Sequence, residues 1–587
     1  MRKTKIICTM GPATDSAEVL EAMIRAGMNV ARFNFSHGEH AEHKKRIDLV
    51  RETAEKLGVP IALLLDTKGP EIRIGKLEND AVTVENGKEI SLTVRDVVGT
   101  AELLPVNYQG IVRDAKVGCT VLIDDGNIEL LCNSVTEDSL RCTVMNGGTI
   151  KTKKSVNLPG IKLSMPYLSA RDEADILFGI EQGVDYIAAS FVTCASDVSS
   201  IRRVLERNHA GRIQIIAKIE NMEGVQNIDE ILAVSDGIMV ARGDMGVEIS
   251  YDELPRIQKH LIKRAYCAGK RAITATQMLE SMIHNPRPTR AEVSDVANAV
   301  FDGTSAIMLS GETAVGKHPV ESVKAMHSIA LKAEQSINYK KRFASADSEA
   351  LTGTITDAIS HATCTTAHDL GAAAIVTVTK TGTTARMISK FRPACDIITL
   401  TTDPIVYRQL ALSWGVIPVM AEEKQTTDEL FDHAVERSAA TGLVKNGDLI
   451  VITLGVPVGV SGSTNTLKVH VMGNVLVSGR GHINNRRVCG TVCVCRSEAE
   501  AREKFRPGDI LVIPETSNKI IDVLRSAKAI VTAADGLDSH AAIVGYTLDI
   551  PVIVGAPNAI SVLKTGNLVT VDAARGIIYG GNVGDHI

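Results

Sequence analysis

Short β-rich segments alternate with stretches of helical periodicity along residues 1–345. In SAEVLEAMIRAG (16–27), for example, apolar residues recur three and four positions apart, as on one face of a helix. The β-rich segments are KIICTMG (5–11), NVARFNF (29–35), IALLLDT (61–67), DYIAASFV (185–192), IQIIAKIE (213–220), GIMVARGD (237–244), RAITATQ (271–277) and SAIMLSGE (305–312). These eight segments, most of them followed by a helical stretch, predict a (β/α)8 barrel.

One connection in this barrel is too long for a single helix. Residues 70–167 contain AVTVENGKEISLTV, CTVLIDDGNIELLC and SLRCTVMNGG, in which apolar and polar residues alternate around Asn-Gly, Asp-Gly and Gly-Gly turns. Such turns between alternating segments are typical of β-hairpins. We therefore expect a small β-barrel domain at 70–167, inserted into a catalytic barrel made of residues 1–69 and 168–345.

Two more domains are expected beyond the barrel. Residues 346–475 return to strand–helix units such as AAAIVTVTK and DLIVITLG, which favour a parallel α/β domain. The stretch near 479–485, which contains RGHINN, is interpreted as a linker. Residues 480–587 combine short apolar strands with a helix that opens at SHAAIVGYTL, and predict an extra C-terminal α/β domain.

Composition narrows the class of protein. The net charge is −5 and the pI about 6.3, which argues against a nucleic-acid partner bound through a broad basic face. No apolar run approaches the roughly 18 residues that a membrane helix needs, and we expect no secretory signal. Eleven cysteines spread along 587 residues favour free thiols over a disulfide framework. We therefore expect a cytoplasmic protein with neither a membrane nor a nucleic acid as partner.

Polar side chains end several of the predicted barrel strands, where an active site forms in this fold. They come in pairs two residues apart, so that both members face the same way: Arg32 and Asn34, Asp66 and Lys68, Lys218 and Glu220, Arg242 and Asp244, Thr274 and Thr276, Ser310 and Glu312. Any one pair could simply turn into solvent. The set as a whole predicts a reaction site at the mouth of the barrel.

The residue types indicate the chemistry. Glu220 and Asp244, on neighbouring strands, could hold a hard divalent ion such as Mg²⁺. Arg32, Arg73 and Lys218 supply positive charge for phosphate or carboxylate groups. This region has no Ser–His–Asp arrangement, no Rossmann fingerprint and no Walker-type loop. Cations and a metal without an obvious nucleophile favour phosphoryl or enolate chemistry.

These residues lie in segments that resemble the pyruvate kinase family. The matching segments, in the family's order, are KTKIICTMGPAT, ARFNFSHG, LLDTKGPEIR, KKSVNLPG, IIAKIENMEG, MVARGDMG, ITATQMLESM and MLSGETAVGKHP. The resemblance implies transfer of a phosphoryl group from phosphoenolpyruvate to ADP, giving pyruvate and ATP. It also implies Mg²⁺ (or Mn²⁺) and K⁺ as cofactors and a homotetramer.

Carried over position by position, the resemblance implies a role for each site residue. Those implied for catalysis and for binding phosphoenolpyruvate are Arg32, Lys218, Gly243, Asp244 and Thr276, with Ser310 in the proton path. The divalent ion would bind Glu220 and Asp244, and the monovalent ion Asn34, Ser36, Asp66 and Thr67. The nucleotide would contact Asn34, His37, Arg73 and Lys154, the last from the inserted domain as it closes. Glu71 resembles the potassium-dependent type of the family.

The segment TKTGTTAR (379–386) lies between a predicted strand and a helix. A glycine- and threonine-rich helix cap explains it as well as an anion site does. The resemblance favours a site for a phosphorylated effector, formed by Thr379, Lys380, Thr381, Gly382, Thr383 and Thr384, with 455–466 on its other side. Both a sugar phosphate and a nucleotide monophosphate remain open as the effector.

The segment 534–555 resembles the swivelling phosphohistidine domain of enzymes that use phosphoenolpyruvate. His540 would be the phosphate carrier, but Asp538 stands where that domain usually has threonine, and its charge would repel a phosphoryl group. A retained structural domain is therefore the favoured interpretation. A carrier enzyme would need an ATP-grasp domain, which we do not find. An inactive metabolite sensor is disfavoured by the intact set of Lys218, Glu220, Asp244 and Thr276.

Overall fold

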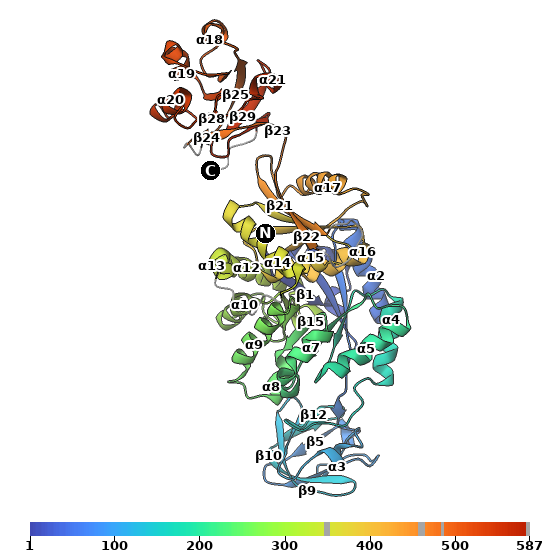
Figure 1. Cartoon of the computed structure of the whole chain (residues 1–587). Helices are drawn as coiled ribbons and strands as arrows, with labels where there is room; N and C mark the ends of the chain where they lie inside the picture. The colour runs from blue at the N-terminus through green and yellow to red at the C-terminus, as the bar shows by residue number, and fades with distance from the viewer. Residues whose placement is uncertain (345–352, 456–463, 483–485, 583–587) are drawn as a thin grey trace. The chain divides into compact units, whose positions relative to one another are not determined.

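The computed structural model describes residues 1–344, 353–455, 464–482 and 486–582 (Figure 1). Contacts within the chain divide it into two compact units. The first comprises Met1–His368, Thr377–Gln425 and Thr453–Thr466, and the second Asp369–Val376, Thr426–Ile452 and Leu467–Ile587.

A closed barrel of parallel strands forms the centre of the first unit, in the order β1-β17-β16-β15-β14-β13-β3-β2. The strands are β1 (Lys5–Thr9), β2 (Val30–Asn34), β3 (Ala62–Asp66), β13 (Tyr186–Ala189), β14 (Gln214–Ile219), β15 (Gly237–Ala241), β16 (Arg271–Ala275) and β17 (Ala306–Leu309). All eight predicted strands are confirmed, and each lies inside its predicted range. Most end before the last polar residue of that range, because the chain leaves the sheet where the loops of the mouth begin.

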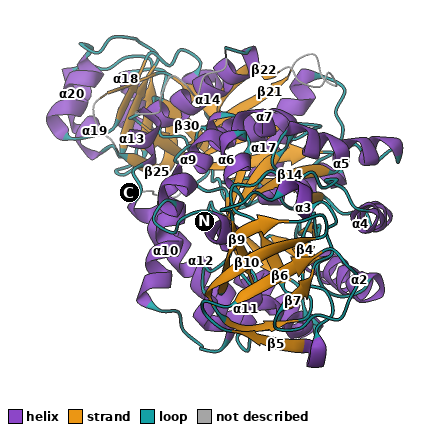
Figure 2. Cartoon of the chain, turned by 90° about the horizontal axis from the view of Figure 1, so that it is seen from below, coloured by secondary structure: helices purple, strands orange, loops and turns teal. Residues whose placement is uncertain are grey.

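Helices surround these strands: α1 (Ala17–Ala26), α2 (His40–Leu57), α4 (Ala170–Glu181), α5 (Ala195–Arg207), α6 (Met222–Gln226), α7 (Ile228–Val234), α8 (Arg242–Glu248), α9 (Leu254–Cys267), α10 (Arg290–Asp302), α11 (Gly311–Ala314), α12 (Pro319–Ser336) and α13 (Tyr339–Ala344). Helices α10 and α12 lie side by side (Figure 2). Local sequence sets their ends. The side chain of Thr289 caps α10, and Gly303 ends it in a left-handed conformation that only glycine adopts without strain.

Apolar side chains fill the barrel on both faces of its wall. Inside the barrel, residues such as Ile7, Leu64 and Met239 form one buried cluster. Between the strands and the helices, residues such as Ile6, Leu63 and Ile238 form another. Neighbours in sequence thus point to opposite faces, as a parallel strand buried on both sides requires. This packing makes the wall a rigid support for the polar side chains at its mouth.

The inserted segment is a β domain with its own core, as predicted. Its sheet has the order β4-β12-β8-β9-β10-β6-β7, and β11 pairs with β5. The strands are β4 (Ile72–Arg73), β5 (Ala81–Val84), β6 (Glu89–Thr93), β7 (Leu103–Pro105), β8 (Thr120–Ile123), β9 (Ile128–Val135), β10 (Ser139–Asn146), β11 (Gly148–Lys151) and β12 (Ser155–Asn157), with one short helix, α3 (Ile111–Asp114). The long strands β9 and β10 pair antiparallel (Figure 2), and residues along β9 alternate between buried and exposed.

Strands and helices alternate again after the barrel. They are α14 (Ile355–Leu370), β18 (Ala374–Val378), α15 (Thr383–Lys390), β19 (Asp396–Thr401), α16 (Pro404–Gln409), β20 (Val416–Met420), α17 (Thr427–Ala440), β21 (Leu449–Gly455) and β22 (Thr464–Val471). The strands form a five-stranded sheet, in which β19 and β20 pair in parallel. The α/β character predicted for this region is confirmed.

The C-terminal region has an eight-stranded sheet in the order β23-β30-β29-β25-β26-β27-β28-β24. Its elements are β23 (Val475–Ser478), β24 (Arg480–His482), β25 (Arg487–Val494), α18 (Glu498–Lys504), β26 (Ile510–Ile513), α19 (Ile521–Ser526), β27 (Ala529–Thr532), α20 (His540–Leu548), β28 (Val552–Val554), α21 (Ala559–Val562), β29 (Leu568–Asp572) and β30 (Ile577–Gly580). The linker prediction is wrong for 480–482, because β24 pairs with β28. The helix predicted at 539–548 is confirmed, and the Ser539 side chain caps it.

Candidate active site

A buried ionic network joins the ends of three barrel strands. The guanidinium Nε of Arg32 lies 2.6 Å from Asp66 Oδ2, and the ammonium of Lys218 lies 3.1 Å from Asp66 Oδ1. Lys218 is also 3.1 Å from Glu220 Oε1. All four side chains are buried, with Asp66 fully inaccessible to solvent. Sequence reasoning named these four residues, and the structure brings them together.

The network fixes the charge of its members. Burial alone would raise the pKa of Asp66, but Arg32 and Lys218 outweigh it and the pKa is lowered. Burial alone would lower the pKa of Lys218, but Asp66 and Glu220 outweigh it and the pKa is raised. Asp66 is therefore an anion and Lys218 a cation at neutral pH. The site thus presents two fixed cations, Arg32 and Lys218, to an anionic substrate.

Glu220 is the second buried carboxylate of this network. Its Oε2 accepts a hydrogen bond from the Phe191 amide, and its buried Oε1 has the Lys218 ammonium, at 3.1 Å, as an ion-pair partner. Burial raises the pKa of Glu220 to about 8, with Lys218 opposing the rise and Asp244 adding to it. Asp244, on α8, is exposed. Within the described residues no set of three or more metal-ligating side chains exists, so a divalent ion here would rely on these two carboxylates and on substrate oxygens.

Gly243 and Thr276 are in direct contact. The amide of Gly243 donates to the Thr276 hydroxyl at 2.7 Å, and Thr276 has a positive φ of 67°. Arg242 holds this loop: its guanidinium donates to the Thr276 carbonyl and pairs with Asp295 at 2.7 Å. Sequence analysis named Arg242 only as a strand-end residue. Arg242 directly precedes Gly243 in the segment MVARGDMG, and this position was the signal from which a positioning role could have been predicted.

The four residues predicted for the monovalent cation end two adjacent strands. Asn34 Oδ1 accepts from the amide of Ser36 at 3.1 Å, and Asp66 is directly followed by Thr67. The Thr67 hydroxyl accepts from the amide of Ser190 at 3.2 Å. β2 pairs with β3 with Asn34 opposite Asp66. The register therefore brings the two pairs of residues to one edge of the mouth.

The residues predicted for the nucleotide are spread more widely. His37 is exposed beside Asn34. The guanidinium of Arg73 donates two hydrogen bonds, of 2.8 and 3.0 Å, to the carboxylate of Glu71. Lys154, in the inserted domain, pairs with Asp124 of the same domain at 2.5 Å. The structure does not bring Lys154 into the Arg32–Lys218 network.

Ser310 follows β17 at the mouth. Its amide donates to Glu312 Oε2 at 2.7 Å, but its hydroxyl is buried with no hydrogen-bond partner. Glu312 is 1% exposed, and burial raises the pKa of its carboxyl. A buried hydroxyl without a partner is a group whose hydrogen bond is left for a ligand or a water.

Sequence reasoning missed Ser190 and Thr9. The Ser190 hydroxyl lies 2.6 Å from the Lys218 ammonium and 2.7 Å from the Thr67 carbonyl, so it links two predicted groups. The Thr9 hydroxyl accepts from Arg32 at 2.9 Å. Both lie at strand ends, Ser190 just after β13, so the strand-end rule used for the other residues would have found them.

The predicted effector loop surrounds the start of α15. Gly382 caps this helix with a positive φ of 77°, and its amide donates to the Thr379 hydroxyl. The hydroxyls of Thr381 and Thr383 lie 3.0 Å apart. Lys380 pairs with Glu423 at 2.5 Å, and Thr384 contacts Thr464 at 2.7 Å. Most of the opposite stretch predicted at 455–466 lies outside the described residues, which resume at Thr464.

His540 is the first residue of α20. Its Nδ1 lies 2.9 Å from the Thr516 hydroxyl and its Nε2 lies 3.0 Å from the Asn518 side-chain oxygen. Asp538 is exposed two residues earlier.

The three cysteines in and just after β25 show no metal geometry: Cys493 and Cys495 are buried, with their sulfurs 3.7 Å apart. No helix in the described part of the chain is long and apolar enough to cross a membrane.

Comparisons with known proteins agree with this geometry. Residues 1–323 match the family described as pyruvate kinase, barrel domain, residues 357–470 the pyruvate kinase alpha/beta domain, and residues 505–576 the mobile domain of PEP-utilising enzymes. A pyruvate kinase of Geobacillus stearothermophilus is 52% identical over 583 residues, and one of Bacillus licheniformis is 51% identical over 583 residues; each alignment covers 99% of both chains.

A crystal structure of a pyruvate kinase from Cryptosporidium parvum has a TM-score of 0.77 at 38% identity, covering 80% of this chain and 96% of that one. The bacterial relatives also extend over the C-terminal domain. Because the barrel match spans more than half of the chain and the relatives align along its whole length, the chain belongs to the pyruvate kinase family of phosphotransferases.

Proposed function

We propose that the barrel mouth transfers the phosphoryl group of phosphoenolpyruvate to ADP, giving pyruvate and ATP. The observation that carries this proposal is the buried network of Arg32, Asp66, Lys218 and Glu220, which holds two cations and two carboxylates at a single point. Phosphoryl transfer needs charge stabilisation and positioning more than covalent chemistry, and this network supplies both.

Arg32 and Lys218 act on the phosphoryl group. Asp66 and Thr9 fix the guanidinium of Arg32, so that it binds the phosphoryl oxygens without losing side-chain entropy in each cycle. Asp66 and Ser190 fix the ammonium of Lys218 in the same way. Lys218 then stabilises the charge that spreads over the phosphoryl oxygens during transfer.

Glu220 and Asp244 are the proposed ligands for Mg²⁺ (or Mn²⁺). The carboxylates of Glu220 and of the exposed Asp244 are oxygen ligands of the type that this ion takes. When bound, the ion supplies Lewis-acid stabilisation for the enolate left by the departing phosphoryl group. Asn34, Ser36, Asp66 and Thr67 are the proposed ligands for K⁺, since all four carry oxygen donors at one edge of the mouth.

The other site residues bind the substrate carboxylate, deliver the proton and bind the nucleotide phosphates. Gly243 and Thr276 bind the substrate carboxylate, which replaces the hydrogen bond that they now share. The unpartnered hydroxyl of Ser310 takes part in delivering the proton to the enolate carbon. Asn34, His37, Arg73 and Lys154 bind the nucleotide phosphates, and Lys154 exchanges Asp124 for phosphate as residues 70–167 close over the site as a lid.

We also propose that a phosphorylated metabolite, a sugar phosphate or a nucleotide monophosphate, activates the enzyme by binding the loop Thr379–Thr384. The Gly382 turn and the hydroxyls around it form a cradle for phosphate oxygens. A homotetramer supplies the quaternary states between which such an effector selects. His540 serves the fold of the C-terminal domain, where Thr516 and Asn518 engage both ring nitrogens.

A coupled assay tests the reaction. Purified protein with Mg²⁺ and K⁺ should form pyruvate from phosphoenolpyruvate and ADP. It should form none from phosphoenolpyruvate with AMP and inorganic phosphate, the substrates of a carrier enzyme. Activity only with phosphoenolpyruvate, AMP and inorganic phosphate would establish the carrier reaction. No activity with either mixture would establish the inactive metabolite sensor.

A further inference from the structure

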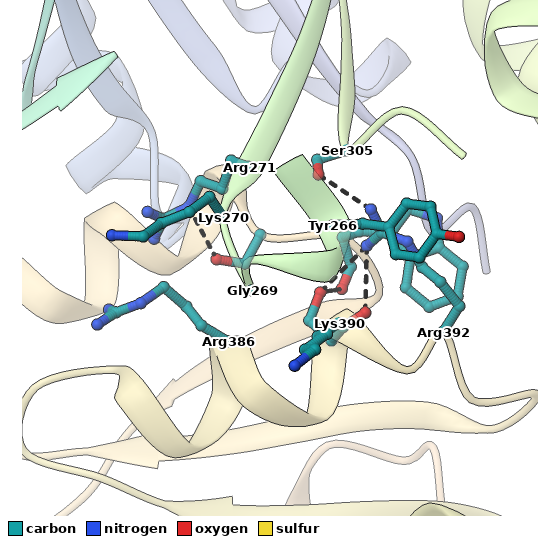
Figure 3. A pocket seen from close by; sticks show the side chains of 11 residues that line it. Tyr266, Gly269, Lys270, Arg271, Ser305, Arg386, Lys390 and Arg392 are labelled. Atoms are coloured by element: carbon teal, nitrogen blue, oxygen red, sulfur yellow. Dashed lines mark hydrogen bonds between the residues drawn. The ribbon is translucent and has the colours of Figure 1, made fainter. Parts of the chain in front are cut away.

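A cluster of cations lies at the end of the barrel opposite to the reaction site. Lys270 and Arg271 stand at the start of β16, and Arg386 lies on α15. They line a partly open pocket whose enclosed free volume is about 10 Å³. Figure 3 shows the side chains of Lys270, Arg271 and Arg386 extending to the same side of this pocket.

Neutral groups accept the hydrogen bonds that these cations make. Lys270 donates to the Ser235 carbonyl at 2.7 Å. Arg271 donates to the side-chain oxygen of Gln214 at 2.7 Å and to the Ser413 hydroxyl at 3.2 Å. Arg386 donates to the carbonyl of Thr381 and the hydroxyl of Thr383, each at 3.0 Å. Among the described residues, no carboxylate lies within hydrogen-bond distance of the three.

One donor in the cluster has no acceptor. Arg271 is 4% exposed, yet its buried Nη2 makes no hydrogen bond. A buried, charged donor left without a partner costs free energy, so native structures usually supply one. Here the missing acceptor would lie beside Lys270 and Arg386.

The nearby carboxylate of Asp236 does not neutralise the positive charge of the three residues. Asp236 acts on Lys270, Arg271 and Arg386, but its carboxylate is already bound by Arg202 at 2.8 Å and by the amide of Ile215 at 2.9 Å. Burial lowers the pKa of Lys270, and it lowers that of Arg386 to about 10, with the neighbouring cations adding to both shifts. The three groups thus repel one another in a partly dry site.

The other two cations of the pocket have partners of their own, although Arg392 Nε, like Arg271 Nη2, is buried and makes no hydrogen bond. Lys390 pairs with Asp357 at 2.9 Å. Arg392 donates to the Gly303 carbonyl and the Ser305 hydroxyl and lies 4.7 Å from the Trp414 ring. Arg392 likewise pairs with no carboxylate among the described residues, and Lys270, Arg271 and Arg386 differ from it in extending to the same side of the pocket (Figure 3).

We propose that Lys270, Arg271 and Arg386 bind a tetrahedral oxyanion, either free phosphate or the phosphoryl end of a small metabolite. Two guanidinium forks and one ammonium match the several acceptor oxygens of such an ion. The enclosed space of the pocket holds no more than about one water, so the anion lies on the side to which the three side chains extend (Figure 3). The site is separate from the loop Thr379–Thr384, although Arg386 contacts the carbonyl of Thr381 in that loop.

The position of the site gives the anion a structural role. Arg386 belongs to the helix that begins at the effector loop, whereas Arg271 begins the strand that ends one residue before Thr276. An anion bound by both arginines ties this helix to that strand. We therefore expect the anion to stabilise the protein and to strengthen the response to an effector bound at the loop.

Calorimetric titration with inorganic phosphate tests the proposal in a background that removes the other phosphate sites. The protein carries Lys380→Ala and Thr384→Ala, and it is held with Mg²⁺, K⁺ and saturating phosphoenolpyruvate so that the loop and the barrel mouth do not respond. Adding Lys270→Gln should weaken phosphate binding at least tenfold. Lys270→Arg, which keeps the charge, and Lys324→Gln, which changes an exposed lysine of α12, should leave binding within twofold.

Crystals soaked in selenate locate the anion by its anomalous signal, which should lie within hydrogen-bond distance of Arg271 Nη2. Equal phosphate binding in Lys270→Gln and in its background would overturn the proposal, as would selenate crystals with only water in the pocket. Should Lys270→Gln fail to fold, the selenate map decides alone. A parallel titration with glycerol 3-phosphate separates the two sources: tighter binding than inorganic phosphate assigns an organic phosphate, and weaker binding assigns the free ion.

Discussion

Replacing Lys218 by methionine removes one charge from the centre of the proposed site while keeping most of the side-chain volume. Lys218 has three oxygen partners, on Asp66, Ser190 and Glu220, at 2.6 to 3.1 Å. Removal of one preorganised charge-stabilising group from an active site costs about 10²- to 10³-fold in turnover, or ~2.7–4 kcal/mol of transition-state stabilisation. We expect Lys218→Met to lose at least ~10²-fold in kcat. The KM for phosphoenolpyruvate should change less, because Arg32 and the metal remain.

The variant also leaves two buried carboxylates with less compensation, so folding must be measured beside activity. Loss of one partner of a buried ion pair costs about 3–5 kcal/mol of stability. Thermal unfolding and circular dichroism show whether the variant is folded at the assay temperature, and Lys45→Met, at an exposed position of α2, is the matched control. A folded Lys218→Met protein that keeps more than a tenth of its turnover would refute the role given to Lys218.

The other predictions concern potassium, the effector loop and the C-terminal domain. Glu71→Lys should largely abolish the K⁺ requirement by supplying a tethered ammonium, and it should raise the KM for ADP because Arg73 loses its bidentate partner. Glu71→Gln, the control variant, should still require K⁺ for activity. The measurement is the rate of each variant with and without K⁺, and an unchanged K⁺ requirement in Glu71→Lys contradicts the prediction. Lys380→Ala with Thr384→Ala should abolish activation by the phosphorylated effector, a coupling of typically ~1–3 kcal/mol, without lowering unactivated turnover; activation that survives places the effector elsewhere. A protein shortened to residues 1–472, which removes the C-terminal sheet from β23 onward, should still make pyruvate and ATP at a rate close to that of the full chain. His540→Ala should change turnover little, and stoichiometric, acid-labile label from phosphoenolpyruvate that disappears in this variant would revive the carrier hypothesis.

The sequence predicted the barrel well because its signal is local and repeated. Each strand is a short apolar run and ends in polar residues, and the closing of the barrel follows from parallel connections. The convergence of Lys218, Glu220 and Asp66 was predictable for the same reason, since all three lie at the ends of strands. The linker prediction at 480–482 failed because a three-residue edge strand has no periodicity of its own, and its pairing with β28 depends on residues about 70 positions away.

Groups that act through others were harder to predict than groups that act directly. Arg242 holds the Thr276 carbonyl and Ser190 joins Lys218 to Thr67, and neither contact follows from residue type, because an arginine or a serine at a strand end has many possible partners.

The cations at the base of the barrel were missed for a further reason. Lys270 and Arg271 are adjacent in sequence, but Arg386 joins them only after the α/β segment docks onto the barrel through contacts such as Lys5 with the Val416 carbonyl and Arg408 with Asp185. Charge that is balanced along the sequence can thus be unbalanced in space. At the mouth, the opposing charges of Asp66 and Glu220 arrive on the same strand ends as the cations. At the base no such carboxylate arrives for Arg271 among the described residues. This contrast between two cationic clusters in one barrel is the physical ground for expecting an anion at the second.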